Sequence, residues 1–185
     1  MPETAMVLLS GGIDSAACTR YMQERGLQAS CLFVDYGQAA VAHEMQSSAT
    51  LAKLLGAEYS AVRAIFPNAF GSGEVVGRNA FLALAGLMVS QINTGSIALG
   101  IHAGTRYYDC TPGFLTSLDR LLAEYTDGRV RAAAPFISWS KRRIFEYYVG
   151  TGLPIEVTYS CEAGTQPPCG ACASCLDRKA LGCNL

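Results

Sequence analysis

The stretch LLSGGIDSAAC, residues 8–18, decides the fold of this chain. It joins an apolar segment, residues 5–9, to a segment from residue 13 onward whose apolar side chains recur at helical spacing. Small and polar residues, two glycines among them, separate the two segments. This order predicts a buried strand, a glycine turn and a helix. Because such a turn gathers backbone N–H groups at the positive end of the helix, it is a site for an anion such as phosphate.

Expected strands and helices alternate along the rest of the chain. The expected strands are continuous apolar runs with no alternation of apolar and polar residues, which indicates an α/β fold with a Rossmann-like parallel sheet covered by helices on both faces. The segment 80–92 is apolar nearly all round and is therefore expected to be a buried helix. Further strands are expected at 30–34, 58–62, 96–101 and 130–133, and further helices at 38–55, 114–125 and 140–148.

Composition limits the classes of partner. The chain has 185 residues, with 14 Lys and Arg against 15 Asp and Glu, so it has no basic field of the kind that binds nucleic acid or membrane surfaces. The longest apolar run, residues 80–89, is shorter than the roughly 20 residues that span a membrane. We therefore expect a cytoplasmic protein with no nucleic-acid or membrane partner.

The glycine turn carries its own chemistry. Ser10 and Ser15 can donate hydroxyl hydrogen bonds to a phosphate, and glycine at positions 11 and 12 leaves room for it. Asp14 would repel a phosphate unless a cation lay between them, which points to Mg²⁺. The alternative is that Asp14 serves only as a helix cap.

Four of the eight cysteines form a cluster near the end of the chain. Its spacing, C-x7-C-x2-C-x2-C, lets four thiolates surround one tetrahedral ion, so we expect structural Zn²⁺, with an iron–sulfur cluster as the alternative. Cys183 follows eight residues later and is expected to lie outside the site. We assign residues 1–154 to an α/β domain that contains the glycine turn and 155–185 to a metal-binding segment. The expected ligands are Cys161, Cys169, Cys172 and Cys175.

The motif SGGIDS, residues 10–15, resembles the SGGxDS signature of the PP-loop ATPases, which bind ATP and Mg²⁺ and adenylate a carboxylate or carbonyl. Within that group the chain is similar to the QueC family, through VDYGQ at 34–38, GRN at 77–79, YYDC at 107–110, SK at 140–141 and the cysteine cluster. The resemblance implies that ATP activates 7-carboxy-7-deazaguanine as an acyl-adenylate, that ammonia gives the amide, and that a second ATP gives the nitrile. It also implies a homodimer.

The resemblance assigns roles to individual residues. Arg78 is expected to hold the substrate carboxylate and Asn79 a purine edge; alternatively they are a surface arginine and a helix-capping asparagine. The position of Asp35 at the carboxyl end of a strand indicates that it holds a metal or orients a nucleoside, unless it is only a turn residue before Gly37. His102 follows another strand and is expected to pack in the interior, with a place in the cleft as the alternative. The catalytic set is Asp14, Ser15 and Lys141; the nucleotide set is Leu9, Ser10, Gly11, Gly12, Asp14, Ser15 and Asp35; the substrate set is Tyr36, Gln38, Arg78 and Asn79.

The chain departs from the family pattern on the substrate side. The loop at 64–76 is short, and Ala39 and Ala40 stand where the family has arginine and histidine. An alternative function is therefore that of a QueC-like paralogue in a bacterial anti-phage defence system, which joins the deazaguanine acid to a protein amine. A nucleic-acid-binding zinc ribbon is disfavoured because the intervals between the cysteines contain no basic or aromatic residue. Thiolation of tRNA is disfavoured because no cysteine outside the cluster is expected in the cleft.

Overall fold

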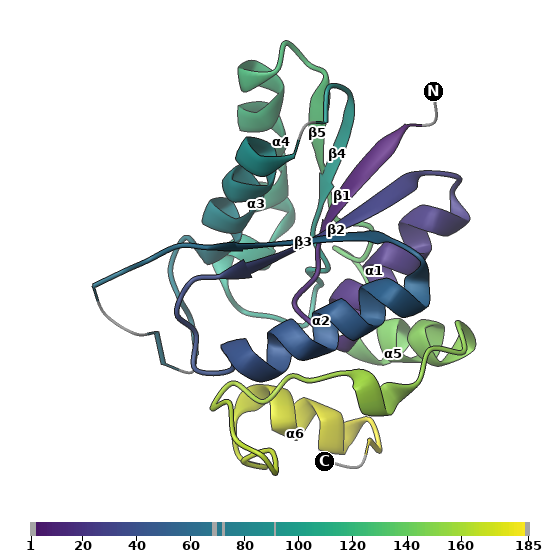
Figure 1. Ribbon diagram of the computed structural model, residues 1–185, viewed down its shortest axis with the longest axis vertical. Helices are drawn as coiled ribbons and strands as arrows, with labels where there is room; N and C mark the ends of the chain where they lie inside the picture. The colour runs from purple at the N-terminus through teal and green to yellow at the C-terminus, as the bar shows by residue number, and fades with distance from the viewer. Residues whose placement is uncertain (1–2, 68–69, 72, 91, 184–185) are drawn as a thin grey trace.

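A computed structural model describes residues 3–67, 70–71, 73–90 and 92–183 of the protein. A five-stranded parallel sheet in the order β3-β2-β1-β4-β5 forms its centre (Figure 1). The strands are β1 Thr4–Leu8, β2 Gln28–Asp35, β3 Glu58–Arg63, β4 Gly95–Ala98 and β5 Val130–Ala133. The helices are α1 Ile13–Glu24, α2 Val41–Leu55, α3 Arg78–Val89, α4 Pro112–Tyr125, α5 Lys141–Gly150 and α6 Ala173–Ala180, with 3-10 turns at Tyr108–Cys110 and Ile155–Val157.

Helices cover both faces of the sheet, as the sequence predicted. α3 and α4 lie on one face, and α1, α2 and α5 lie on the other (Figure 1). The central strand β1 supplies both layers, since Val7 belongs to the core under α1 and α5 while Leu8 belongs to the core under α3 and α4. This alternation explains why the strand is apolar on both sides.

The glycine turn lies where the strand order changes direction. β1 pairs with β2 on one side and with β4 on the other, so that Val7 stands beside both Cys31 and Ala98. Open α/β sheets bind ligands outside the carboxyl ends of the strands at such a point. The turn after β1 therefore occupies the expected position for a ligand site.

The expectation that the helix at 80–92 is buried was wrong for its outer side. The observed helix α3 buries only Asn79, Ala83 and Gly86, while Met88 is 85% exposed and Val89 is 42% exposed. The side of the helix that carries the small residues Ala83 and Gly86 faces the sheet, where a Cβ on Gly86 would lie 3.5 Å from both Leu8 and Ile97. The larger residues Phe81, Leu82, Leu84 and Leu87 are partly buried at the margin of the same core, and in this helix only Met88 and Val89 are exposed. Among the described residues, no helix is long and apolar enough to cross a membrane.

The C-terminal segment packs against the glycine turn and the start of α2 (Figure 1). Tyr159 donates a backbone hydrogen bond to the carbonyl of Gly11 at 3.0 Å. A Cβ on Gly164 would lie 2.2 Å from the carbonyl oxygen of Ala39, so only glycine permits this approach. Cys183 joins the core formed by α1 and α5. The segment thus shares its packing with the α/β body.

Gly11 is expected to be intolerant of a side chain. Its φ is +88°, and a Cβ there would lie 2.7 Å from the carbonyl oxygen of Glu44 in α2. Gly11→Ala should therefore lower the free energy of unfolding by about 2–3 kcal/mol, measured by urea denaturation. Gly150→Ala, at a glycine with no neighbour within 4 Å of its Cβ position, serves as the control and should change it by less than about 1 kcal/mol. Equal stabilities of the two variants would contradict this assignment.

Candidate active site

A cleft of about 550 Å³ opens at the carboxyl edge of the sheet. Its walls come from the ends of β1, β2 and β4, from the first turns of α1, α2 and α3, and from the C-terminal segment. The structure brings most of the predicted site residues together here: Leu9, Ser10, Gly12, Asp14, Ser15, Tyr36, Gln38, Arg78, Asn79 and Lys141. Gly11 and Asp35 are not among the lining residues.

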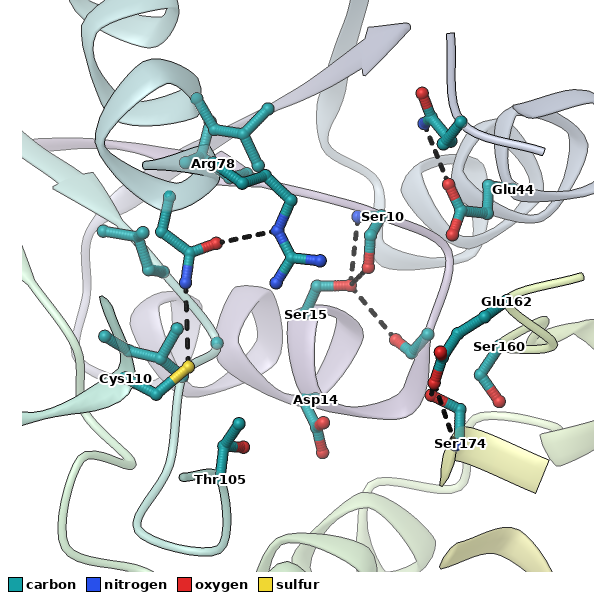
Figure 2. Close-up of a pocket in the computed structure, with 18 of the residues that line it drawn as sticks. Ser10, Asp14, Ser15, Glu44, Arg78, Thr105, Cys110, Ser160, Glu162 and Ser174 are labelled. Atoms are coloured by element: carbon teal, nitrogen blue, oxygen red, sulfur yellow. Dashed lines mark hydrogen bonds between the residues drawn. The ribbon is translucent and has the colours of Figure 1, made fainter. Parts of the chain in front are cut away.

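The glycine turn is held by its two serines (Figure 2). The backbone N–H of Ser10 donates to the Ser15 hydroxyl at 3.2 Å, and that hydroxyl donates to the carbonyl of Gly12 at 3.1 Å. The Oγ atoms of Ser10 and Ser15 are also 3.2 Å apart. Gly12 is the N-cap of α1 and no side chain caps the helix, so the interpretation of Asp14 as a cap is wrong. The positive end of α1 faces the cleft.

Asp14 is shared between two basic side chains. Its Oδ2 accepts a hydrogen bond from Lys141 Nζ and lies 3.7 Å from His102 Nε2. Its Oδ1 is buried and has no hydrogen-bond partner among the described residues. A buried carboxylate oxygen without a donor is a suitable ligand atom for a cation.

His102 is buried, as expected, and it also lines the cleft, which was the alternative that the sequence left open. Its Nδ1 accepts a hydrogen bond from the N–H of Gly104 at 2.9 Å, so Nε2 carries the proton and faces Asp14. Burial lowers the pKa of His102, although the charge of Asp14 partly opposes that effect. The side chain is therefore expected to be neutral at pH 7.

Asn79 supports Arg78 instead of facing the cleft with a free amide. Its side-chain nitrogen donates to the carbonyl of Asp109 at 3.0 Å, and its oxygen accepts from Arg78 Nε at 3.3 Å. The backbone N–H of Asn79 also donates to the Asp109 carboxylate at 3.2 Å. These contacts use the groups that were expected to read a purine edge. The terminal nitrogens of Arg78 point into the cleft (Figure 2).

Asp35 has a local role. One carboxylate oxygen accepts from the N–H of Gly37 at 3.0 Å, and the other pairs with Arg63 Nε at 2.5 Å. Both oxygens are occupied outside the cleft, which matches the turn alternative and not the metal or nucleoside role. Gly11, in turn, serves the packing of α2 and not the space for an anion. The sequence could not separate these roles because turns and ligand sites use the same residue types.

Two glutamates of the cleft wall escaped the sequence analysis. Glu44 and Glu162 both line the cleft (Figure 2). Burial raises the pKa of Glu44, and its contact with Gln38 partly offsets this. Glu162 is fully engaged, since one oxygen accepts from the N–H and hydroxyl of Ser174 at 3.1 and 2.9 Å and the other from Gly73 N at 3.1 Å. For Glu44, the signal available in the sequence was its place in the first turn of the helix that follows VDYGQ.

The cysteine cluster lies beside this wall. The sulfurs of Cys161, Cys169, Cys172 and Cys175 are all within 4.8 Å of one another. The N–H of Cys169 points at the sulfur of Cys161 at 3.3 Å; burial raises the pKa of Cys161, but such donors outweigh it and lower the pKa to about 5. Four sulfurs around Zn²⁺ at about 2.3 Å would be about 3.8 Å apart, so small movements would complete a site. Cys183 is not part of the group.

The comparison with known proteins identifies the family. The model of "Queuosine biosynthesis protein QueC" matches residues 4–77 and 70–182. The chain belongs to the QueC family. It is 33% identical to the 7-cyano-7-deazaguanine synthase of Prochlorococcus marinus strain NATL1A over 97% of this chain and 93% of the relative, and 34% identical to that of strain NATL2A over 96% and 92%.

A solved structure supports the fold alone. The predicted subunit of a tRNA methyltransferase from Methanocaldococcus jannaschii is 12% identical, with a TM-score of 0.54, over 80% of this chain and 74% of that one. The two ranges matched by the QueC model overlap at residues 70–77, at the end of the short loop at 64–76. The alignment with the first Prochlorococcus protein spans 210 positions, more than the 185 residues of this chain, so that relative carries residues that are missing here.

Proposed function

We propose that the protein uses ATP to convert the carboxylate of 7-carboxy-7-deazaguanine into an acyl-adenylate, with release of pyrophosphate. Ammonia then displaces AMP to give the amide, and a second ATP activates the amide oxygen so that its departure with AMP leaves the nitrile. Membership of the QueC family supports the substrate class. The observation that carries the chemistry is the uncapped start of α1, flanked by Ser10 and Ser15 and by Lys141, on one wall of the cleft.

The glycine turn would bind the phosphates of ATP. Backbone N–H groups of the turn and the two serine hydroxyls would hold the pyrophosphate, next to Leu9 and Gly12. When the substrate oxygen attacks the α-phosphorus, negative charge passes to the departing pyrophosphate. Lys141, which contacts Asp14 in this structure, is within reach of that charge and would stabilise it.

Asp14 would hold Mg²⁺, because its buried Oδ1 has no partner among the described residues. When bound there, Mg²⁺ would neutralise charge on the phosphate oxygens. His102 faces the other carboxylate oxygen through Nε2 and would keep Asp14 in place after Lys141 turns to the phosphates. Four thiolates without a vacant position would hold Zn²⁺ in a structural role, next to the wall formed by Glu162 and Ser174.

Arg78 would bind the carboxylate of the substrate. Its Nε is held by Asn79, which leaves two terminal nitrogens for a carboxylate. Tyr36 and Gln38 form the neighbouring wall. This arrangement would bring the reacting oxygen beside the phosphate site, which is the main requirement for a displacement at phosphorus.

A second candidate acceptor is a protein amine. It is favoured by the short loop at 64–76 and by the two small residues Ala39 and Ala40, which stand where the family has larger side chains. The adenylation step is the same for both acceptors, and only the second step differs.

The product decides between the two. The protein is incubated with the acid, ATP, Mg²⁺ and ammonium, and the products are identified by mass spectrometry. A control reaction contains 7-deazaguanine, which lacks the carboxylate, in place of the acid. We expect AMP and the amide or nitrile. If AMP forms only after hydroxylamine is added, together with the hydroxamate, then ammonia is not the acceptor. No acid-dependent AMP in either mixture would contradict the proposed function.

A further inference from the structure

Glu44 is a half-buried carboxylate of the cleft wall whose position is fixed through one oxygen. Asp14 is engaged by Lys141 and His102 through Oδ2 only, Glu162 is engaged by Gly73 and Ser174 through both oxygens, and Asp177 is exposed. In the part of the chain that the structure describes, Glu44 has no ion pair, and its carboxylate accepts one hydrogen bond, from Gln38 Nε2 to Oε2 at 2.9 Å. The second oxygen is therefore available to a ligand.

The orientation of Glu44 is fixed from two sides. Gln38 is 8% exposed; its Oε1 accepts from Tyr36 N at 2.9 Å, and its Nε2 also donates to Val34 O at 3.2 Å, so the amide that holds Glu44 is locked in one orientation. The backbone of Glu44 packs on the glycine turn, because the Cβ position of Gly11 is 2.7 Å from its carbonyl oxygen. The carboxylate consequently has a fixed place relative to the phosphate site.

Arg78 and Glu44 stand on opposite sides of the serine pair in the close-up (Figure 2). The guanidinium of Arg78 points toward the serines, whereas Glu44 lies on the wall shared with the C-terminal segment. A ligand that spans this space would carry an acid group at the end beside Arg78 and hydrogen-bond donors at the end beside Glu44. The substrate of the proposed function has this distribution, since its carboxylate and its 2-amino-pyrimidinone edge lie at opposite ends of a flat ring system.

We propose that Glu44 is the specificity residue for the guanine-like edge, accepting hydrogen bonds from the ring N–H and the 2-amino group. This inference rests on the proposed function, because it takes the deazaguanine acid as the ligand. A carboxylate accepts two adjacent N–H donors in one plane. Gln38 is the positioning residue that holds the carboxylate for this contact.

The test compares two ligands that differ only in the 2-amino group. Equilibrium binding of 7-carboxy-7-deazaguanine and of 7-carboxy-7-deazahypoxanthine is measured by calorimetry in the absence of ATP. The wild-type protein should bind the guanine acid about 10- to 100-fold more tightly, as expected for a lost hydrogen bond to a charged group. In Glu44→Gln this ratio should fall below about threefold, because an amide presents a donor to one of the two N–H groups. Glu44→Asp, whose carboxylate is set back by one methylene, should give an intermediate ratio.

Glu124→Gln, at an exposed position of α4, is the matched control and should keep the wild-type ratio. ATP binding by each variant confirms that the glycine turn is intact. A wild-type ratio in Glu44→Gln, an equal loss of both ligands, or no preference in the wild type would overturn the inference. Because the binding is measured without ATP, a failure of the adenylation chemistry would leave this result unaffected. Such a failure is recognised in the product experiment, by the absence of AMP.

Discussion

Replacement of Lys141 by alanine is expected to lower kcat/KM for acid-dependent AMP formation by about 100- to 1000-fold. Lys141 is the first residue of α5, and its ammonium reaches the Oδ2 atom of Asp14 beside the glycine turn. In the proposed reaction, negative charge would grow next to this ammonium as pyrophosphate leaves, so Lys141 would stabilise the transition state more than it stabilises bound ATP. The loss should be found mainly in kcat, with a smaller rise in KM for ATP.

The neighbouring Arg142 provides the matched control for Lys141. Its side chain contacts the carbonyl of Ala180 at 3.3 Å and does not line the cleft. Arg142→Ala should keep at least about half of the wild-type activity, and Lys141→Arg should recover part of the activity that the alanine variant loses. Similar rates for the two alanine variants would contradict the catalytic role.

The second large effect is expected in the cysteine cluster. Cys175 is fully buried, and its sulfur lies 4.0 Å from that of Cys169. Cys175→Ser should reduce the bound zinc from about one ion per chain to below about 0.2 and lower the free energy of unfolding by more than about 3 kcal/mol, because metal binding is coupled to folding. Elemental analysis and urea denaturation measure the two quantities.

Cys183→Ala separates metal binding from simple burial of a thiol. Cys183 is also buried, but it lies outside the four-sulfur group and packs in the core with α1 and α5. This variant should retain the full zinc content and lose only about 1 kcal/mol of stability. A Cys175→Ser protein with wild-type zinc content would show that the four thiols are not a metal site.

The α/β fold could be predicted from the sequence because its signals are local. Uninterrupted apolar strands, the glycine turn after β1 and the hydroxyl of Ser140, which caps α5 by accepting from Arg143 N at 3.3 Å, depend on neighbouring residues. The position of α3 could not be predicted in the same way. An apolar helix such as this one does not indicate which side meets the sheet, and here the small residues Ala83 and Gly86 do so.

Several separate motifs predicted which residues line the cleft, but the contacts of a residue were predictable only where one motif contains both partners. The glycine turn with Asp14 was found from its own residues, whereas the contacts of Asn79 depend on Asp109, 30 positions later in the chain. The place of His102 beside Asp14 likewise depends on the neighbouring ends of β1 and β4. Glu44 carries no motif in the sequence, and its importance follows from its unused oxygen in the cleft.

The most direct test of the account is the exchange of labelled pyrophosphate into ATP, measured with the deazaguanine acid and Mg²⁺ but without ammonia. Reversible formation of an acyl-adenylate predicts exchange that requires the acid and is lost in Lys141→Ala. Release of ADP and phosphate without any exchange would show that the γ-phosphate is transferred instead, and would contradict adenylation at the glycine turn.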